Sequence, residues 1–151
     1  MVFCLLFSVK EVNILLFVSI DEVARYGCYE TEFRTEQTYL FNTRTFQFER
    51  LVEILEKLDI TQEEFYPYDY DYIELFSQSE AQTQREYIAQ SKRKDWDKNF
   101  KNITDDVQFE AYFQHLFEHD YAYRDWYCYH MKKAREKAIE WCKKNNIPYN
   151  V

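Results

Sequence analysis

A single glycine, Gly27, in a chain of 151 residues is the feature that most limits what this protein can fold into. Glycine adopts positive φ most readily and lets a backbone approach a ligand closely, so turns here must depend on Asn, Asp and Ser. The glycine-rich loops that hold nucleotide phosphates, GxGxxG and GxxxxGK, cannot be written with one glycine. Any phosphate must therefore be bound by side chains or by helix N-termini.

The chain has the size and composition of one folded domain, which we expect to span residues 1–151. Hydrophobic residues make up 46% of it and charged residues 30%, which excludes the composition of a disordered chain. The cysteines form no CxxC pair, so we expect reduced thiols in a cytoplasmic protein. They are Cys4, Cys28, Cys128 and Cys142.

The first 20 residues are strongly apolar but contain Lys10, Glu11 and Asn13. They lack both a basic start and an unbroken apolar run of about 20 residues, so we expect neither a signal peptide nor a membrane span. The β-branched and aromatic residues of Val12–Ile20 instead predict a buried strand.

Alternation of apolar and polar residues predicts a sheet in the first third of the chain. The segments Val23–Phe33 and Thr38–Phe48 are rich in Tyr, Phe and Thr, and we expect antiparallel strands joined near Arg34–Gln37. Leucine and isoleucine then recur at helical spacing over residues 49–58, which predicts an amphipathic helix packed on that sheet.

Helical periodicity dominates the rest of the chain, roughly over residues 80–100, 105–118 and 120–145. The last of these has a stripe of apolar residues along one side, made of Tyr123, Tyr127, Met131, Ala134, Ala138 and Trp141. The predicted fold class is therefore α+β, with an N-terminal antiparallel or mixed sheet packed against several helices and a helix-rich C-terminal half.

Acidic and basic residues are sorted into separate stretches. The formal net charge is −8, and residues 51–80 alone hold nine acids against one base. Residues 81–101 reverse this balance, with six bases against three acids. A basic helix can follow the phosphates of double-stranded DNA, although a solvated helix face is the simpler interpretation. The residues expected to contact DNA are Arg85, Gln90, Lys92, Arg93, Lys94 and Lys98.

Four polar residues share one face of the expected helix over residues 80–100. Gln82, Glu86, Gln90 and Arg93 are spaced four, four and three apart. On that face Glu86 can hold a divalent cation or accept a proton from water, and Arg93 can bind phosphate oxygens. The same pattern also fits an ordinary exposed helix.

The run from Tyr66 to Tyr72 alternates along its length. In an extended conformation it places tyrosines on one side and Asp69 with Asp71 on the other. Paired carboxylates bind Mg²⁺ or Mn²⁺, so Asp69, Asp71 and Glu86 are the candidate metal ligands and one of these cations is the expected cofactor. An acidic, aromatic edge strand is the competing interpretation.

His115 and His119 lie four apart on an expected helix, a spacing that can bind Zn²⁺. Cys128 and His130 follow soon after. No HExxH pattern accompanies them, so packed or exposed histidines are the simpler interpretation.

With Glu86 and its order of sheet and then helices, the chain resembles the small α+β DNA nucleases of filamentous archaeal viruses of the lipothrixvirus type. The Tyr-rich, Gly-poor composition and the face from Gln82 to Arg93 carry this resemblance. It implies hydrolysis of linear double-stranded DNA in the host cytoplasm, with Glu86 as the catalytic carboxylate. Asp69-x-Asp71 is also similar to the metal pair of nucleotidyltransferases, which implies a remotely related topology. The Gly-Ser that normally precedes that pair is absent, which argues against nucleotide transfer.

Three functions are compatible with these patterns. The leading expectation is a DNA nuclease. The alternative is a non-enzymatic inhibitor whose acidic residues 51–80 imitate a phosphate backbone and occupy a nucleic-acid-binding protein. A packaging protein, the third, would bind DNA without cleaving it. DNA binding separates the first two, because an acidic mimic is repelled by DNA.

Overall fold

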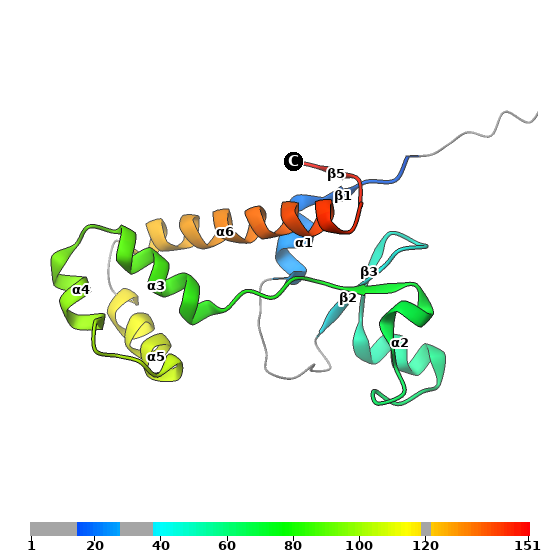
Figure 1. The fold of residues 1–151 in the computed structure, drawn as a ribbon, viewed down its shortest axis with the longest axis horizontal. Helices are drawn as coiled ribbons and strands as arrows, with labels where there is room; N and C mark the ends of the chain where they lie inside the picture. The colour runs from blue at the N-terminus through cyan, green and yellow to red at the C-terminus, as the bar shows by residue number, and fades with distance from the viewer. Residues whose placement is uncertain (1–14, 28–37, 119–121) are drawn as a thin grey trace, which may run out of the picture.

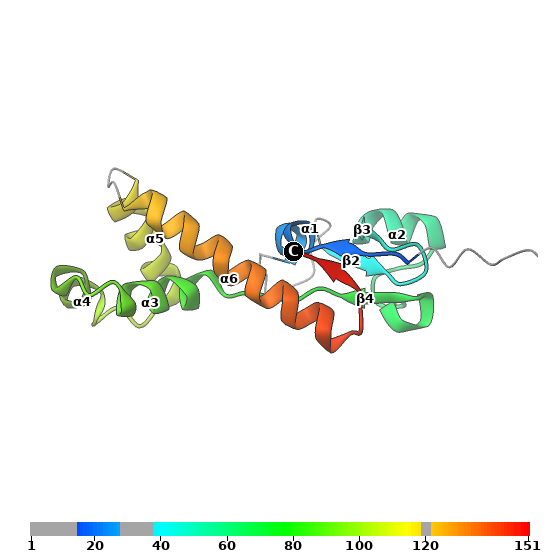
Figure 2. The same ribbon diagram turned by 90° about the horizontal axis from the view of Figure 1, so that it is seen from above.

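The computed structural model describes residues 15–27, 38–118 and 122–151 and confirms the predicted α+β class. The protein is elongated, with the short strands and α2 (Leu51–Leu58) at one end (Figure 1). The other end, which we call the helical end, consists of α3 (Glu80–Gln90), α4 (Lys94–Phe100) and α5 (Asp106–Phe117). The long helix α6 (Tyr123–Lys144) runs between the two ends, and a second view gives the same arrangement (Figure 2). Helices dominate the C-terminal half, as expected.

The N-terminal segment is helical where the sequence analysis predicted strands. Val18–Ser19 (β1) is a strand and Ile20–Gly27 forms α1, so the strand predicted over 12–20 is confirmed at residues 18–19 and the strand predicted over 23–33 is wrong over residues 23–27. Residues 12–14 and 28–33 lie outside them. The buried face of α1 consists of Ile20, Val23, Ala24 and Gly27, which have helical spacing. The same segment also fits an alternating pattern, which is why the sequence analysis predicted a strand. Residues 15–17 are exposed, in contrast to the predicted buried strand.

A hairpin replaces the single strand predicted over residues 38–48. Tyr39–Asn42 (β2) pairs antiparallel with both Gln47–Arg50 (β3) and Tyr72–Glu74 (β4), in the order β3-β2-β4. Asn42 makes the turn, since its side-chain oxygen accepts hydrogen bonds from the backbone N–H groups of Arg44 and Thr45. The joint predicted at residues 34–37 lies outside the described residues.

Helix α2, Leu51–Leu58, follows β3 directly and packs on this sheet as predicted. Its buried face and the sheet share one apolar cluster, formed by Leu40, Leu51, Ile54, Phe65 and Tyr72. The chain then makes a short 3-10 helix, η1, Pro67–Tyr70, before it enters β4.

The helix predicted over residues 80–100 is two helices, α3 (Glu80–Gln90) and α4 (Lys94–Phe100). Lys92 between them has φ 58°, a left-handed conformation that ends α3. Helix α5, Asp106–Phe117, lies close to its predicted bounds, and the Asp105 side chain caps it by accepting from the N–H of Gln108. Together with α6 these helices bury a mainly aromatic cluster, made of Tyr87, Ile88, Trp96, Phe100, Phe109, Phe113, Phe117 and Trp126.

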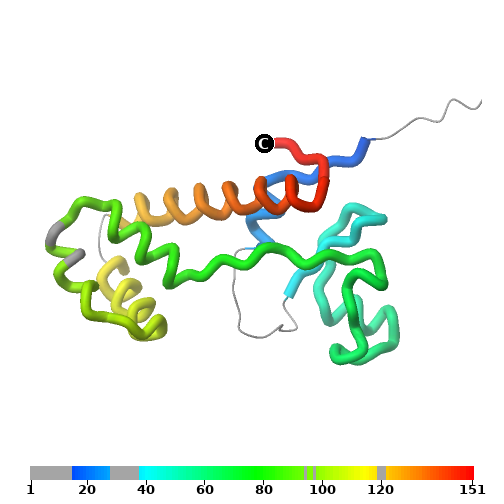
Figure 3. The backbone as a smooth tube through the Cα atoms, viewed as in Figure 1, coloured from blue at the N-terminus to red at the C-terminus, as the bar shows by residue number. Residues whose placement is uncertain are grey.

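Helix α6, Tyr123–Lys144, links the two ends of the protein (Figure 3). Its Trp126 belongs to the aromatic cluster, whereas Ala134 and Ala138 are fully buried in a separate core around α1. Small side chains there let α1 and α6 pack closely, and Arg135 forms an ion pair with Asp21. Two of the six residues in the predicted stripe, Tyr123 and Tyr127, are exposed. After α6, Tyr149–Asn150 (β5) pairs parallel with β1.

Candidate functional site

The strongest charge feature of the structure is the segment of residues 51–74, which we call the acidic end. It comprises α2, η1, β4 and their connections, and it lies opposite the helical end (Figure 1). Its eight carboxylates all belong to exposed residues. They are Glu53, Glu56, Asp59, Glu63, Glu64, Asp69, Asp71 and Glu74.

Lys57, the one base of the acidic end, is held by an acid outside it. Its Nζ lies 2.7 Å from Glu49 Oε1 and donates to the Tyr72 hydroxyl at 2.9 Å. Glu49 also accepts from Asn42 at 2.9 Å. Burial raises the pKa of Glu49, but hydrogen bonds from Lys57, Asn42 and Tyr72 outweigh burial and leave that pKa below its usual value. The positive charge of Lys57 is thus matched within this network and does not offset the exposed carboxylates.

Two carboxylates of the acidic end are paired with arginines of the hairpin. Arg50 lies 2.5 Å from Glu53, and Arg44 lies 2.6 Å from Asp71. Within the described ranges, five others form no ion pair, namely Glu56, Asp59, Glu63, Glu64 and Asp69. The acidic end therefore presents uncompensated negative charge to solvent.

Exposed tyrosines accompany these carboxylates. Tyr66 and Tyr68 are 66% and 76% exposed, and Tyr70 is 37% exposed. The run from Tyr66 to Tyr72 is not extended throughout, because residues 67–70 form η1 and Asp71 adopts a left-handed conformation with φ 62°. The tyrosines consequently do not line one side of a strand.

The candidate metal ligands are not brought together. Asp69 and Asp71 lie at the acidic end, whereas Glu86 is on α3 at the helical end (Figure 1). No group of three or more His, Cys, Asp or Glu side chains suited to a metal ion occurs among the residues that the structure describes. Asp69 and Asp71 therefore do not share one site with Glu86 in this structure, and the metal and its ligands stay a prediction.

Three of the four residues on the predicted polar face, Gln82, Glu86 and Gln90, lie on α3. Gln82 donates to Glu86 at 3.1 Å, and Gln90 lies exposed one turn further along α3. Arg93 leaves this face because α3 ends before it. Its guanidinium instead lies 3.9 Å from the centre of the Trp96 ring and 3.0 Å from a carboxylate oxygen of Asp95.

Helix α6 adds residues beside Glu86 that the sequence analysis missed. The pKa of Lys133 is raised by Tyr129 first, then by Glu136, with a further contribution from Glu86. The Lys133 Nζ lies 3.5 Å from Glu136 and 5.6 Å from the centre of the Tyr129 ring. The spacing of these three residues along the predicted helix could have placed them on one face, but nothing in the sequence paired that face with α3.

Only part of the predicted DNA-contacting set is available at the surface. Arg85 is tied to the start of α5, since it donates to the backbone oxygen of Ile103 at 2.9 Å and pairs with Asp106 at 2.8 Å. Lys92 and Lys98 are exposed. Lys94 begins α4.

The histidines do not form a zinc site in the described part of the chain. His115 is exposed, and His119 lies outside the described residues. His130 lies 3.0 Å from a carboxylate oxygen of Glu80, while Cys128 is exposed. Of the cysteines, Cys128 and Cys142 are free thiols, as expected, and Cys4 and Cys28 lie outside the described residues.

Comparisons with known proteins identify no relative. No family model matches the chain, no curated protein matches it, and no solved structure matches it. The nucleotidyltransferase-like topology therefore stays a prediction. None of the helices in the described ranges is both long and apolar enough to cross a membrane.

Proposed function

We propose that this chain is a non-enzymatic binding protein whose acidic end engages a basic protein surface of the kind that contacts nucleic acid. One observation carries the proposal, namely eight exposed carboxylates within residues 51–74, whose one base is neutralised by Glu49. This is the arrangement expected of an acidic protein that occupies a phosphate-binding surface.

Charge and aromatic exposure act together in this proposal. Uncompensated carboxylates steer a basic partner toward the acidic end and raise the rate of association, an effect that salt screens. Tyr66 and Tyr68 add apolar area with a hydroxyl at the tip, and tyrosine is enriched where proteins bind one another. Their exposure beside the carboxylates supports binding of a protein rather than of free ions.

The test measures binding of a fluorescent peptide from a DNA-contacting helix, rich in Lys and Arg, by anisotropy at low and physiological salt. The triple variant Glu56→Gln, Asp59→Asn and Glu63→Gln should weaken binding about tenfold or more. The control Glu22→Gln, Asp125→Asn and Glu140→Gln removes three exposed carboxylates elsewhere and should change binding little. Equal losses in both variants would show that net charge alone, and not the acidic end, attracts the peptide.

A second candidate is the DNA nuclease, favoured by the Gln82–Glu86 pair beside Lys133 and Glu136. Glu86 and Glu136 would hold Mg²⁺ or Mn²⁺, which binds through one or two carboxylates and neutralises charge on a phosphodiester. Lys133 would bind a phosphate oxygen, and the exposed Lys92 and Lys98 would contact the DNA backbone. The resemblance to archaeal viral nucleases bears on this candidate alone.

A further inference from the structure

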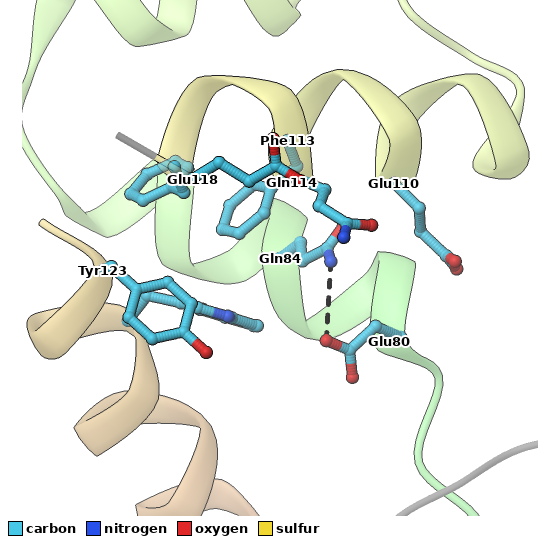
Figure 4. Close-up of a pocket in the computed structure, with 9 residues that line it drawn as sticks. Glu80, Gln84, Glu110, Phe113, Gln114, Glu118 and Tyr123 are labelled. Carbon is cyan, nitrogen blue, oxygen red and sulfur yellow. Dashed lines mark hydrogen bonds between the residues drawn. The ribbon is translucent and has the colours of Figure 1, made fainter. Parts of the chain in front are cut away.

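A cavity of about 490 Å³ lies at the helical end, between α3, α5 and the first turn of α6. Its polar lining comes from Glu80 and Gln84 of α3, Glu110 and Gln114 of α5, Glu118 directly after α5, and Tyr123 of α6 (Figure 4). This volume falls within the range of cavities that hold small organic ligands.

The polar wall of the cavity is negatively charged. Glu80 is engaged, since a carboxylate oxygen lies 3.0 Å from His130 Nε2 and the other accepts from Gln84 at 3.5 Å. Glu110 and Glu118 are exposed and form no ion pair with any residue in the described ranges. The cavity therefore favours a cation.

Aromatic side chains form the rest of the cavity lining. Phe113 and Phe117 are stacked with their ring centres 4.3 Å apart, and Trp126 meets Phe113 edge to face at 4.8 Å. Tyr123 is 57% exposed and stands at the edge of the cavity (Figure 4). Phe113, Phe117 and Trp126 are buried against one another, so Tyr123 offers the most exposed ring to a cation, which the face of an aromatic ring attracts.

Gln84 gives independent evidence that a ligand belongs here. Its side chain is buried, with the residue 5% exposed, and its Oε1 has no hydrogen-bond partner in the described structure. An unsatisfied buried acceptor destabilises a folded protein, and Gln84 lines the cavity, so a hydrogen-bond donor from a bound ligand would satisfy this oxygen. Carboxylates alone would accept any cation, whereas this oxygen favours a ligand that also carries a hydrogen-bond donor.

We propose that the cavity binds a guanidinium group. A guanidinium is planar, stacks on aromatic rings and carries N–H donors on several edges, so it can serve Gln84 Oε1 and a carboxylate of Glu118 at once. A simple ammonium lacks the flat face, and a quaternary ammonium lacks the N–H donors. The site lies at the opposite end from the acidic end and is independent of the function proposed above.

Two sources supply this chemistry, a free small guanidine and the arginine side chain of a protein. Calorimetric titration of the full chain with agmatine tests the first, and titration with acetyl-arginine amide or an Ala-Arg-Ala peptide tests the second. Peptides with citrulline in place of arginine keep the shape and lose the charge. Binding of agmatine but not of butylamine, which carries only the ammonium, identifies a free small guanidine, and binding of the peptide identifies an arginine-bearing partner. Either result supports the proposal.

Two variants place the ligand in the cavity. Gln84→Met keeps the length of the side chain and removes the unpaired acceptor, so we expect an intact fold and binding weakened about tenfold or more. Glu118→Gln should weaken binding similarly, whereas Glu140→Gln, an exposed control on α6, should leave it unchanged. Thermal unfolding of each variant confirms that it is folded. No binding of agmatine or the arginine peptides at millimolar concentration, or equal binding of citrulline and arginine, would overturn the proposal.

Discussion

The ring of Phe76 lies against Gly27 so closely that a Cβ atom at position 27 would come within 2.5 Å of it. The glycine of this chain thus permits a close approach between the end of α1 and the segment after β4. We expect Gly27→Ala to lower the free energy of unfolding by about 1 to 3 kcal/mol, because the ring must move out of its packed position. Urea unfolding measures the change.

A shorter side chain in place of Phe76 should reduce the destabilisation that Gly27→Ala causes. Phe76→Leu alone costs some packing, but the double variant with Gly27→Ala should lose less than the sum of the two single losses. Strict additivity would show that the methyl group and the ring do not meet.

The break between α3 and α4 gives a prediction of opposite sign. Lys92 adopts φ 58°, which costs a non-glycine residue about 1 to 2 kcal/mol. Lys92→Gly should relieve that strain and raise the free energy of unfolding by about 0.5 to 1 kcal/mol after the entropy of glycine is counted. Lys98→Gly, within α4, removes the same charge and should instead destabilise by about 1 kcal/mol. A continuous helix through position 92 would make both substitutions destabilising.

Strong helical periodicity allowed much of the helical structure to be predicted. Helices α2, α5 and α6 each bury apolar residues at helical spacing, and Asp105 supplies a readable cap for α5. The hairpin was not predictable in the same way, because Phe46 adopts φ 59° at a position where hairpin turns usually have glycine. Helix α1 was missed because eight residues can satisfy both a helical and an alternating pattern.

The candidate sites depend on contacts between distant parts of the sequence. The charge of the acidic end was visible from composition, but its exposure was not, and the arginine that pairs with Asp71 is Arg44, 27 residues away. The pairing of Glu86 with α6 and the cavity around Gln84 arise from how three helices pack. Spacing along one helix gives no information about which other helix faces it.

Acid should weaken the network around Glu49. Its folded-state pKa lies below the usual value, so the stability that it contributes is present at neutral pH and is lost as pH falls through that folded pKa. Glu49→Gln should therefore lower the free energy of unfolding by about 1 to 2 kcal/mol at pH 7, with the difference from wild type shrinking below about pH 4. Chemical unfolding across pH 3 to 7 tests this, and a difference that stays constant with pH would contradict it.

The described cysteines should differ in reactivity. Cys128 is exposed, whereas Cys142 is buried and burial raises the pKa of its thiol to about 11. Because the thiolate is the reactive form, iodoacetamide at pH 8 should label Cys128 within minutes and Cys142 only after unfolding. Peptide mass spectrometry resolves the two sites. Labelling of Cys142 at a similar rate in the folded protein would show that it is not enclosed by α1 and α6.

The second candidate function makes a prediction about linear double-stranded DNA incubated with Mg²⁺ or Mn²⁺. If Glu86 is the catalytic carboxylate, Glu86→Gln should abolish cleavage without unfolding the protein, because Glu86 is exposed on α3. Asp69→Asn should cleave like wild type, since Asp69 lies at the other end of the molecule, and this distinguishes the structure from the sequence hypothesis that joined the two residues. EDTA should stop cleavage in every active variant, and Glu140→Gln serves as the exposed control on α6.

Intact DNA after incubation with the wild-type protein would rule out the nuclease function and leave the acidic end as the candidate functional surface. Cleavage that needs Asp69 but not Glu86 would instead move the active site to that end.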